Sequence, residues 1–209
     1  IGLMCYDLLA GRLGLGRSLP LSKRRTLAEI PGLLTEGLHG GVVYHDGQFD
    51  DSRMAVTLAL SAADHGATVL NYVRVKSLIK DDAGKICGVE AVDILSGSSY
   101  RVRAKVVVNA TGVFVDEVMR MDAPEARKKV RPSQGVHLVV EGSFLGGAAA
   151  LMIPKTKDGR VLFGVPWHGK VVLGTTDTPL DEAFLEPRAL EEEIDFILDQ
   201  AGQYLSRKP

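Results

Sequence analysis

The chain of 209 residues contains 45% hydrophobic, 24% charged and 6% aromatic residues, which is typical of a globular protein. This composition excludes collagen-like, disordered and disulfide-stapled classes. The 25 Lys and Arg residues nearly balance the 26 Asp and Glu residues, so we expect no nucleic-acid partner. Cys5 and Cys87 lie far apart, and their spacing predicts neither a disulfide framework nor a metal site.

The N-terminal residues 1–10 place apolar side chains at helical spacing, and the glycines that follow at 11, 14 and 16 favour a helix end. The stretch starts at Ile1 and has no basic leader or small-residue cleavage site, so we do not expect a signal peptide. No window has the roughly 20 apolar residues that cross a bilayer, which leaves peripheral attachment as the alternative.

Residues 19–41 combine prolines, glycines and basic residues, a pattern that favours a loop with a single helical turn around Leu27. Asp50 can cap a helix whose apolar run, Met54–Ala63, is followed by Gly66. Because this run is apolar on nearly every side, we expect the helix to be buried on more than one side.

Several short strands are predicted in the middle of the chain. They cover 42–44, 68–70, 73–79, 86–94 and 100–103, with turns at 81–84 (DDAG) and 96–99 (SGSS). Val106–Val108 is a continuous β-branched run, which is typical of a strand covered on both faces. The order of these elements predicts an α/β sheet with an antiparallel meander attached.

The C-terminal half alternates helix and strand signals. We expect helices at 115–121 and 190–201, a strand at 136–140, a Gly/Ala-rich loop at 142–150, and strands at 152–154, 160–165 and 170–174. The turn signals Asp158–Gly159 and His168–Gly169 predict that the last three strands form an antiparallel meander. The predicted fold class is therefore α/β (α+β mixed): one sheet with an attached meander, and a second antiparallel sheet packed by helices.

The short motifs of self-contained nucleotide, metalloprotease and hydrolase sites (GxGxxG, P-loop, HExxH and GxSxG) are absent from the sequence. The most informative segment is VVVNATG, residues 106–112, where a strand is expected to end in small residues. Ligands of open α/β sheets lie at the carboxyl ends of strands, and small residues there allow a cofactor to come close. From these residues alone, a tight turn that binds nothing explains the segment equally well.

Five strings resemble the FAD-dependent glycerol-3-phosphate dehydrogenase and oxidase family, in order and through most of the chain. They are IGLMCYDLLAGR (1–12), YHDGQFDDSRMAVTLALSAADHGATVLNYV (44–73), VVVNATG with FVDE (106–117), VRPSQGVHLVV (130–140) and MIPKTKDGRVLFGVPWHGKVVLGTTDT (152–178). The resemblance implies a flavoprotein that oxidises sn-glycerol 3-phosphate to dihydroxyacetone phosphate by hydride transfer to FAD. It also implies a middle fragment, which lacks the glycine-rich ADP-binding unit and is expected to be inactive in isolation.

The resemblance assigns cofactor contacts to two places. Val75 matches a strand position whose backbone contacts adenine, although an ordinary strand valine explains it as well. Ala110, Thr111 and Gly112 match a turn beside the ADP moiety of FAD. Val113–Phe114 replaces the usual Pro-Trp of the family, so the aromatic contact is altered while the small-residue turn is intact.

The resemblance assigns substrate contacts to Arg131 and His137. A guanidinium suits a phosphate dianion because it donates two parallel hydrogen bonds, and the alternative for Arg131 is a surface ion pair. As an alternating strand residue, His137 is more often a hydrogen-bonded core histidine than an acid or base. Gln134 stands where the family commonly has lysine, whereas Trp167–His168 and Gly174–Asp177 match and are expected to shape the substrate domain. The catalytic acid or base is expected outside this chain, and no metal is implied.

The resemblance also divides the chain: about 42–122 belongs to the FAD-binding domain, and about 1–41 and 123–209 belong mainly to the substrate-binding domain. The implied partners are sn-glycerol 3-phosphate and, as electron acceptor, quinone or oxygen, with a homodimer as an option. The expected location is cytoplasmic, or peripheral on the inner membrane. Two other functions stay open: a related FAD-dependent oxidase of 2-hydroxy acids or amines, and a non-catalytic recognition domain.

Overall fold

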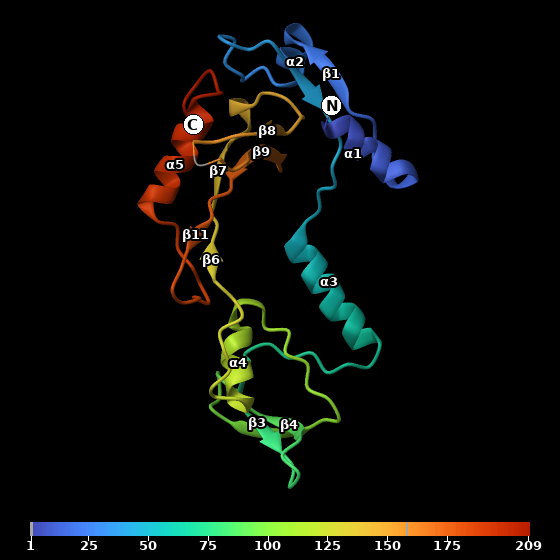
Figure 1. Cartoon of the computed structure of the whole chain (residues 1–209), viewed down its shortest axis with the longest axis vertical. Helices are drawn as coiled ribbons and strands as arrows, with labels where there is room; N and C mark the ends of the chain where they lie inside the picture. The colour runs from blue at the N-terminus through green and yellow to red at the C-terminus, as the bar shows by residue number, and fades with distance from the viewer. Residues whose placement is uncertain (1, 158) are drawn as a thin grey trace. The chain divides into compact units, whose positions relative to one another are not determined.

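The computed structural model describes residues 2–157 and 159–209, and the chain forms two compact units. Unit 1 combines the segments Ile1–Gly47 and Ser133–Pro209, and unit 2 is the intervening segment Gln48–Pro132. Figure 1 shows this division by colour, because unit 1 contains both the blue start and the orange and red end of the chain. Unit 2 is therefore an insertion, in sequence, within unit 1.

The largest sheet of unit 1 has four antiparallel strands in the order β7-β10-β9-β8. Their bounds are His137–Glu141 for β7, Leu151–Ile153 for β8, Leu162–Trp167 for β9 and Lys170–Gly174 for β10. The predicted meander of three strands is confirmed, and β7 extends it by one. His168 and Gly169 connect β9 to β10 with φ of 46° and 77°, as a two-residue hairpin turn requires. The other predicted turn includes Asp158, which lies outside the described residues.

Besides two short 3-10 helices, Gly11–Leu13 and Gly142–Phe144, the remaining elements described in unit 1 are three α-helices and two small strand pairs. They are α1 (Gly2–Ala10), α2 (Lys23–Glu29), α5 (Glu191–Gly202), β1 (Leu19–Ser22) with β2 (Gly40–Val43), and β6 (Ser133–Gln134) with β11 (Thr178–Pro179). The expected helical turn around Leu27 is confirmed as part of α2, whereas the expectation of a loop over the rest of residues 19–41 is wrong, because β1 and the start of β2 lie there. The Ser22 side chain accepts a hydrogen bond from the Arg25 backbone and caps α2, and this local signal outweighs the neighbouring prolines and glycines.

The hydrophobic core lies in unit 1, between the four-stranded sheet, α5 and the segment after α2. Its buried residues are Ile30, Leu33, Leu145, Ile153, Leu162, Val171, Leu173, Ile197, Ala201 and Leu205. Backbone hydrogen bonds join the two segments of the unit: the Leu34 N–H donates to the Tyr204 carbonyl at 2.8 Å, and the Ser206 N–H donates to the Gly32 carbonyl at 2.8 Å. Residues far apart in sequence therefore share one core.

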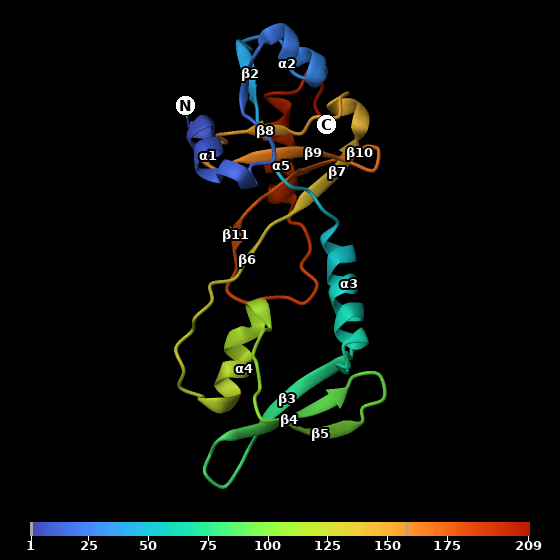
Figure 2. The same ribbon diagram turned by 90° about the vertical axis from the view of Figure 1, so that its right-hand side faces the viewer.

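Besides a short 3-10 helix, Gly112–Phe114, unit 2 contains a three-stranded antiparallel sheet in the order β3-β4-β5 and two α-helices. Their bounds are Val73–Lys80 for β3, Ile86–Asp93 for β4, Ser99–Arg103 for β5, Asp51–Asp64 for α3 and Val115–Asp122 for α4. Contacts between α4 and β3 place this helix against the sheet (Figure 2). The predicted meander is confirmed, whereas residues 68–70 form no strand.

Two burial predictions for unit 2 are wrong. The helix α3 forms as expected and is capped by Asp50, but none of its residues is buried. Val106–Val108 forms no strand, and Val106 and Val108 are 73% and 79% exposed. A strand covered on both faces needs neighbouring strands and covering helices, and none of the described strands pairs with this run.

Within the described chain, no helix is long and apolar enough to cross a membrane.

Candidate functional site

The turn at residues 110–112 is held by the side chain of Asn109. The Asn109 Nδ2 donates to the Val115 carbonyl at 2.9 Å, and the Asn109 Oδ1 accepts from the Thr111 hydroxyl at 2.7 Å. Ala110, Thr111 and Gly112 are all exposed. Gly112 has a φ of +57°, and no atom lies within 4 Å of the point where a Cβ would stand. The turn therefore presents small residues on a fixed backbone that a ligand can approach closely.

Asn109 was not singled out from the sequence, although it belongs to the VVVNATG string. An asparagine two residues before a threonine can fasten a turn through its own side chain, and that local pattern could have indicated its role. The structure shows that Asn109 acts on both sides of the turn, since it reaches the following helix α4 as well as Thr111.

Val75 lies in β3, where it pairs with Ala91 of β4 and precedes a bulge at Lys76. Its side chain is half-buried. Because β3 is at the edge of the described sheet, part of its backbone hydrogen-bonding groups face away from β4. A backbone contact to a ligand at this strand is therefore compatible with the sheet.

Asp116 is a buried carboxylate in the first turn of α4, with 6% of its surface exposed. Its two oxygens accept hydrogen bonds from the Lys129 backbone N–H at 2.9 and 3.0 Å, and its Oδ2 accepts from the Val130 N–H at 3.1 Å. These backbone hydrogen bonds hold the pKa of Asp116 below its usual range, although burial acts in the opposite direction. The carboxylate is thus charged, and it fixes the backbone that leads to Arg131.

Arg131 itself is exposed at the end of unit 2. The ion pairs seen among residues 2–157 and 159–209 join other groups, such as Lys80 with Asp122 and Lys170 with Glu141. A surface ion pair, which was the alternative for this residue, is not formed within the described chain. The guanidinium is therefore accessible to an anionic ligand.

His137 begins β7 in unit 1 and is exposed, so the expectation of a hydrogen-bonded core histidine is wrong. The reason is that β7 is an edge strand and His137 lies on its exposed face. In the antiparallel register His137 stands opposite Gly174, and a Cβ at Gly174 would collide with the imidazole ring. The glycine of the GTTD string therefore leaves room for this ring.

A second buried carboxylate, Glu193, lies in the first turn of α5 and is 4% exposed. Its Oε2 accepts from the Gln134 side-chain amide at 2.7 Å and from the Leu190 N–H at 2.9 Å. Its Oε1 accepts from the hydroxyls of Thr176 at 3.1 Å and Thr178 at 2.5 Å. Burial raises the pKa of Glu193, but these hydrogen bonds outweigh it and hold the pKa below its usual range.

Glu193 joins three parts of unit 1 that the sequence could not place together: β6, the segment after β10 and the start of α5. The Thr176 Oγ1 also accepts from the Val136 backbone N–H at 3.1 Å, which fixes the chain just before His137. Gln134 is buried and contacts Glu193, so its role at this position is to complete the carboxylate's hydrogen bonds.

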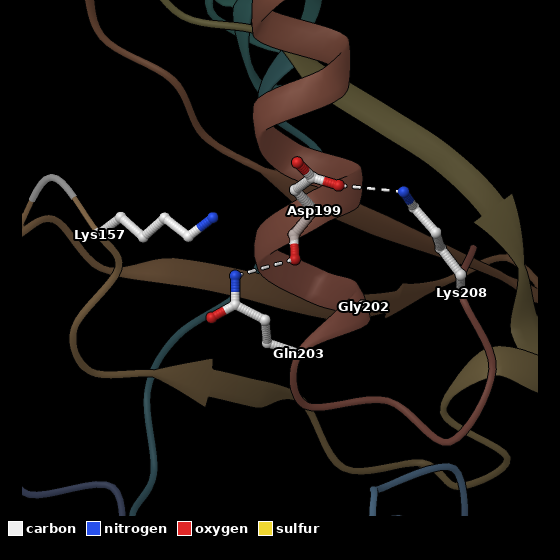
Figure 3. A pocket seen from close by; sticks show the side chains of 5 residues that line it. All are labelled: Lys157, Asp199, Gly202, Gln203 and Lys208. Atoms are coloured by element: carbon white, nitrogen blue, oxygen red, sulfur yellow. Dashed lines mark hydrogen bonds and ion pairs between the residues drawn. The ribbon is translucent and has the colours of Figure 1, made fainter.

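A surface depression of about 300 Å³ lies at the C-terminal end of α5. It is lined by Lys157, Asp199, Gly202, Gln203 and Lys208 (Figure 3). The Lys208 Nζ pairs with Asp199 at 3.0 Å, and the Gln203 amide donates to the Asp199 carbonyl at 3.2 Å. None of the site residues expected from the sequence lines this depression. Among the described residues, no group of three or more His, Cys, Asp or Glu side chains could hold a metal ion.

Comparison with known proteins defines the class of this chain. A family model described as FAD dependent oxidoreductase matches residues 4–208, and the chain belongs to this family. The glycerol-3-phosphate dehydrogenase structure from Bacillus halodurans, complexed with FAD, matches with a TM-score of 0.80 at 37% identity over 89% of this chain and 37% of that chain. Glycine oxidase from Bacillus cereus matches with a TM-score of 0.68 at 20% identity over 97% of this chain and 52% of that chain, which shows a shared fold alone.

The names of the curated relatives are more specific than the description of the family model. The mitochondrial glycerol-3-phosphate dehydrogenase of Homo sapiens is 44% identical over 211 residues, which cover 99% of this chain and 29% of the relative. The enzyme of the same name from Schizosaccharomyces pombe is 42% identical over 214 residues, which cover 98% of this chain and 33% of the relative. The chain thus spans about a third or less of the length of these relatives.

Proposed function

We propose that this chain is part of an FAD-dependent glycerol-3-phosphate dehydrogenase. The reaction oxidises the secondary alcohol of sn-glycerol 3-phosphate to the ketone of dihydroxyacetone phosphate. The observation that carries the proposal is the 44% identity to the human glycerol-3-phosphate dehydrogenase along 99% of the chain. FAD supplies the redox chemistry by accepting a hydride, and the protein binds and orients the reactants.

Unit 2 contributes to FAD binding in this proposal. The turn Ala110–Gly112 suits the ADP moiety because its side chains are small and exposed, and because space is open beside Gly112. The edge strand β3 offers backbone groups near Val75 for the adenine. Residues of about 42–122 form part of the FAD-binding domain, and about 1–41 and 123–209 serve mainly substrate binding.

Arg131 binds the phosphate of the substrate in this proposal, because its guanidinium is exposed and follows a backbone fixed by Asp116. In unit 1, His137 contributes a polar contact to the substrate from the exposed start of β7. Glu193 and the side chains that donate to it, Gln134, Thr176 and Thr178, form the Glu193 cluster. This cluster supports β7, because Thr176 also accepts a hydrogen bond from the Val136 backbone N–H.

The substrate class is tested with the full-length flavoenzyme by anaerobic bleaching of the flavin absorbance. Glycerol 3-phosphate should bleach the flavin, whereas 2-hydroxy acids and amines at the same concentration should not. Bleaching by a 2-hydroxy acid or an amine in preference to glycerol 3-phosphate would refute the proposal. Flavin that responds to none of these compounds would favour a recognition role.

The 209-residue chain alone should neither hold FAD tightly nor turn over substrate. The glycine-rich motif that places a pyrophosphate at a helix N-terminus is absent from its sequence. A purified chain with stoichiometric FAD would contradict this expectation.

The electron acceptor is identified with the full-length enzyme, by comparing its reduction of a quinone analogue with its consumption of oxygen.

Two properties of the assembled enzyme complete the proposal, its location and its oligomeric state. The two curated relatives are named mitochondrial, and we place the enzyme peripherally on the inner mitochondrial membrane. Membrane fractionation tests this location, since release by salt is expected of a peripheral protein. A homodimer is proposed for the full-length enzyme, and its mass in solution tests it.

A further inference from the structure

The hydrogen bonds of Asp116 are tertiary contacts of a helix residue. Asp116 is the second residue of α4, where an acidic side chain also interacts favourably with the helix dipole. Its oxygens are nevertheless engaged by Lys129 and Val130, 13 and 14 residues further along the chain. A surface helix needs no such contact, so the dipole alone does not explain why this carboxylate is buried.

The burial of Asp116 has a desolvation cost that its hydrogen bonds to the backbone must offset. Removing a carboxylate from water is unfavourable unless its oxygens are well hydrogen-bonded. Two successive backbone N–H groups supply those bonds and thereby fix two neighbouring peptide planes. Asp116 therefore determines the course of the chain at Lys129 and Val130 rather than at its own helix.

Arg131 lies between two constraints. Its preceding residue, Val130, is held by Asp116, and its following residue, Pro132, is buried. A residue before proline is restricted to extended backbone conformations. The Arg131 side chain is exposed, so a restricted backbone carries an accessible guanidinium. Because the backbone is already restricted, mainly the side-chain torsions of Arg131 must be ordered when its guanidinium meets an anion.

We propose that Asp116 is a positioning residue that fixes the backbone before Arg131 and so directs its guanidinium to the phosphate of the substrate. This inference rests on the proposed function, because it uses the phosphate role of Arg131. Asp116 does not contact the substrate and acts through the 129–131 segment.

The test compares Asp116→Asn, Arg131→Ala and the double variant in the full-length flavoenzyme. Asparagine keeps the size of the side chain but turns one acceptor into a donor, which faces the backbone N–H groups. We expect Asp116→Asn to lower kcat/KM for glycerol 3-phosphate about tenfold, through KM, and to leave the turnover of glycerol and the FAD content unchanged. In the Arg131→Ala background, Asp116→Asn should cause no further loss, because both act on the same contact.

Glu117→Gln is the matched control, since Glu117 is an exposed carboxylate in the same helical turn. It should leave both substrates unaffected. The inhibition constant of inorganic phosphate gives a second readout, and it should rise in Asp116→Asn but not in Glu117→Gln. Should Asp116→Asn fail to retain FAD, Asp116→Glu keeps the charge, moves the oxygens and should show the same selective loss.

The outcomes separate this inference from the proposed function. A loss for glycerol 3-phosphate in Arg131→Ala but not in Asp116→Asn would overturn the positioning role and leave the phosphate role intact. Equal losses for glycerol and glycerol 3-phosphate in Asp116→Asn would also overturn it, since they indicate a purely structural carboxylate. An Arg131→Ala variant with unchanged kcat/KM for both substrates would overturn the phosphate role and, with it, this inference.

Discussion

The two units bury their apolar residues to very different extents. Of the buried hydrophobic residues in the described parts of the chain, Ala91 alone lies in unit 2, and the others form the core of unit 1. In unit 2, Met54, Val56 and Leu58 of α3 are 50%, 60% and 60% exposed. Unit 1 is therefore stabilised by its own core, whereas unit 2 depends on turns, strand pairing and buried polar contacts such as those of Asp116.

The largest expected effect is a cavity in the core of unit 1. Leu162 is fully buried, and Leu162→Ala in the 209-residue chain should lower the free energy of unfolding by about 2–5 kcal/mol. Leu58→Ala in α3 is the matched leucine of unit 2, and it should cost no more than about 0.5 kcal/mol because the side chain is mostly in water. Urea unfolding measures both, and equal losses would refute the contrast.

The next effect concerns the Glu193 cluster of unit 1. Glu193→Ala removes one of the two acceptors of the buried Gln134 amide, the other being the Arg188 carbonyl, and should cost about 1–3 kcal/mol, because a buried N–H that loses its acceptor keeps its desolvation penalty. Glu191→Ala is the control from the same helical turn, where the side chain is exposed, and it should change stability little. A similar loss in both variants would show that the helix dipole, not the cluster, is responsible.

The same carboxylate predicts a dependence of stability on pH. The pKa of Glu193 is lower in the folded chain than the value of about 4.3 in an unfolded chain. Its contribution is therefore present in full above the unfolded value, and it is lost as pH falls through the folded value. The difference in unfolding free energy between the original chain and Glu193→Ala should be constant from pH 7 to about pH 5 and shrink below about pH 4. A difference that grows on acidification would contradict this sign.

The smallest effect tests whether the backbone of unit 2 is ordered at the candidate cofactor turn. Gly112→Ala should cost about 1 kcal/mol, because alanine must adopt a left-handed φ of +57°. Gly47→Ala is the control, since a Cβ there also meets no atom within 4 Å and the glycine has no positive φ. Thermal unfolding of both variants measures the difference, and no cost at Gly112 would show that the turn is not fixed in the isolated chain.

Local signals in the sequence predicted most elements. The capping residue Asp50 and the apolar run after it predicted α3, and the His168–Gly169 pair predicted the hairpin of β9 and β10. Burial was predicted less well, since the exposure of α3 and of Val106–Val108 depends on which other elements are present to cover them. A periodic pattern shows that a surface is apolar, but it does not show what packs on it.

The candidate site was located only in part. The VVVNATG string identified the turn 110–112 because its run of small residues is a local feature, although the strand expected before the turn does not form. Asn109, Asp116 and Glu193 were not singled out, because their roles come from partners elsewhere in the fold. A carboxylate in the first turn of a helix looks like a favourable surface charge until its distant donors are known.

The pairing of residues 30–34 with residues 204–206 has a consequence for synthesis. Leu33 forms a bridge with Leu205, and both side chains are buried in the finished core. On the ribosome, residues 30–34 wait for their partners until residues 204–206 have emerged, while the hairpins of β3, β4 and β5 can close as soon as their own strands emerge. Ile30 and Leu33 thus stay without these core partners during that time, and the late closure of a long loop should make unit 1 the slower of the two units to fold.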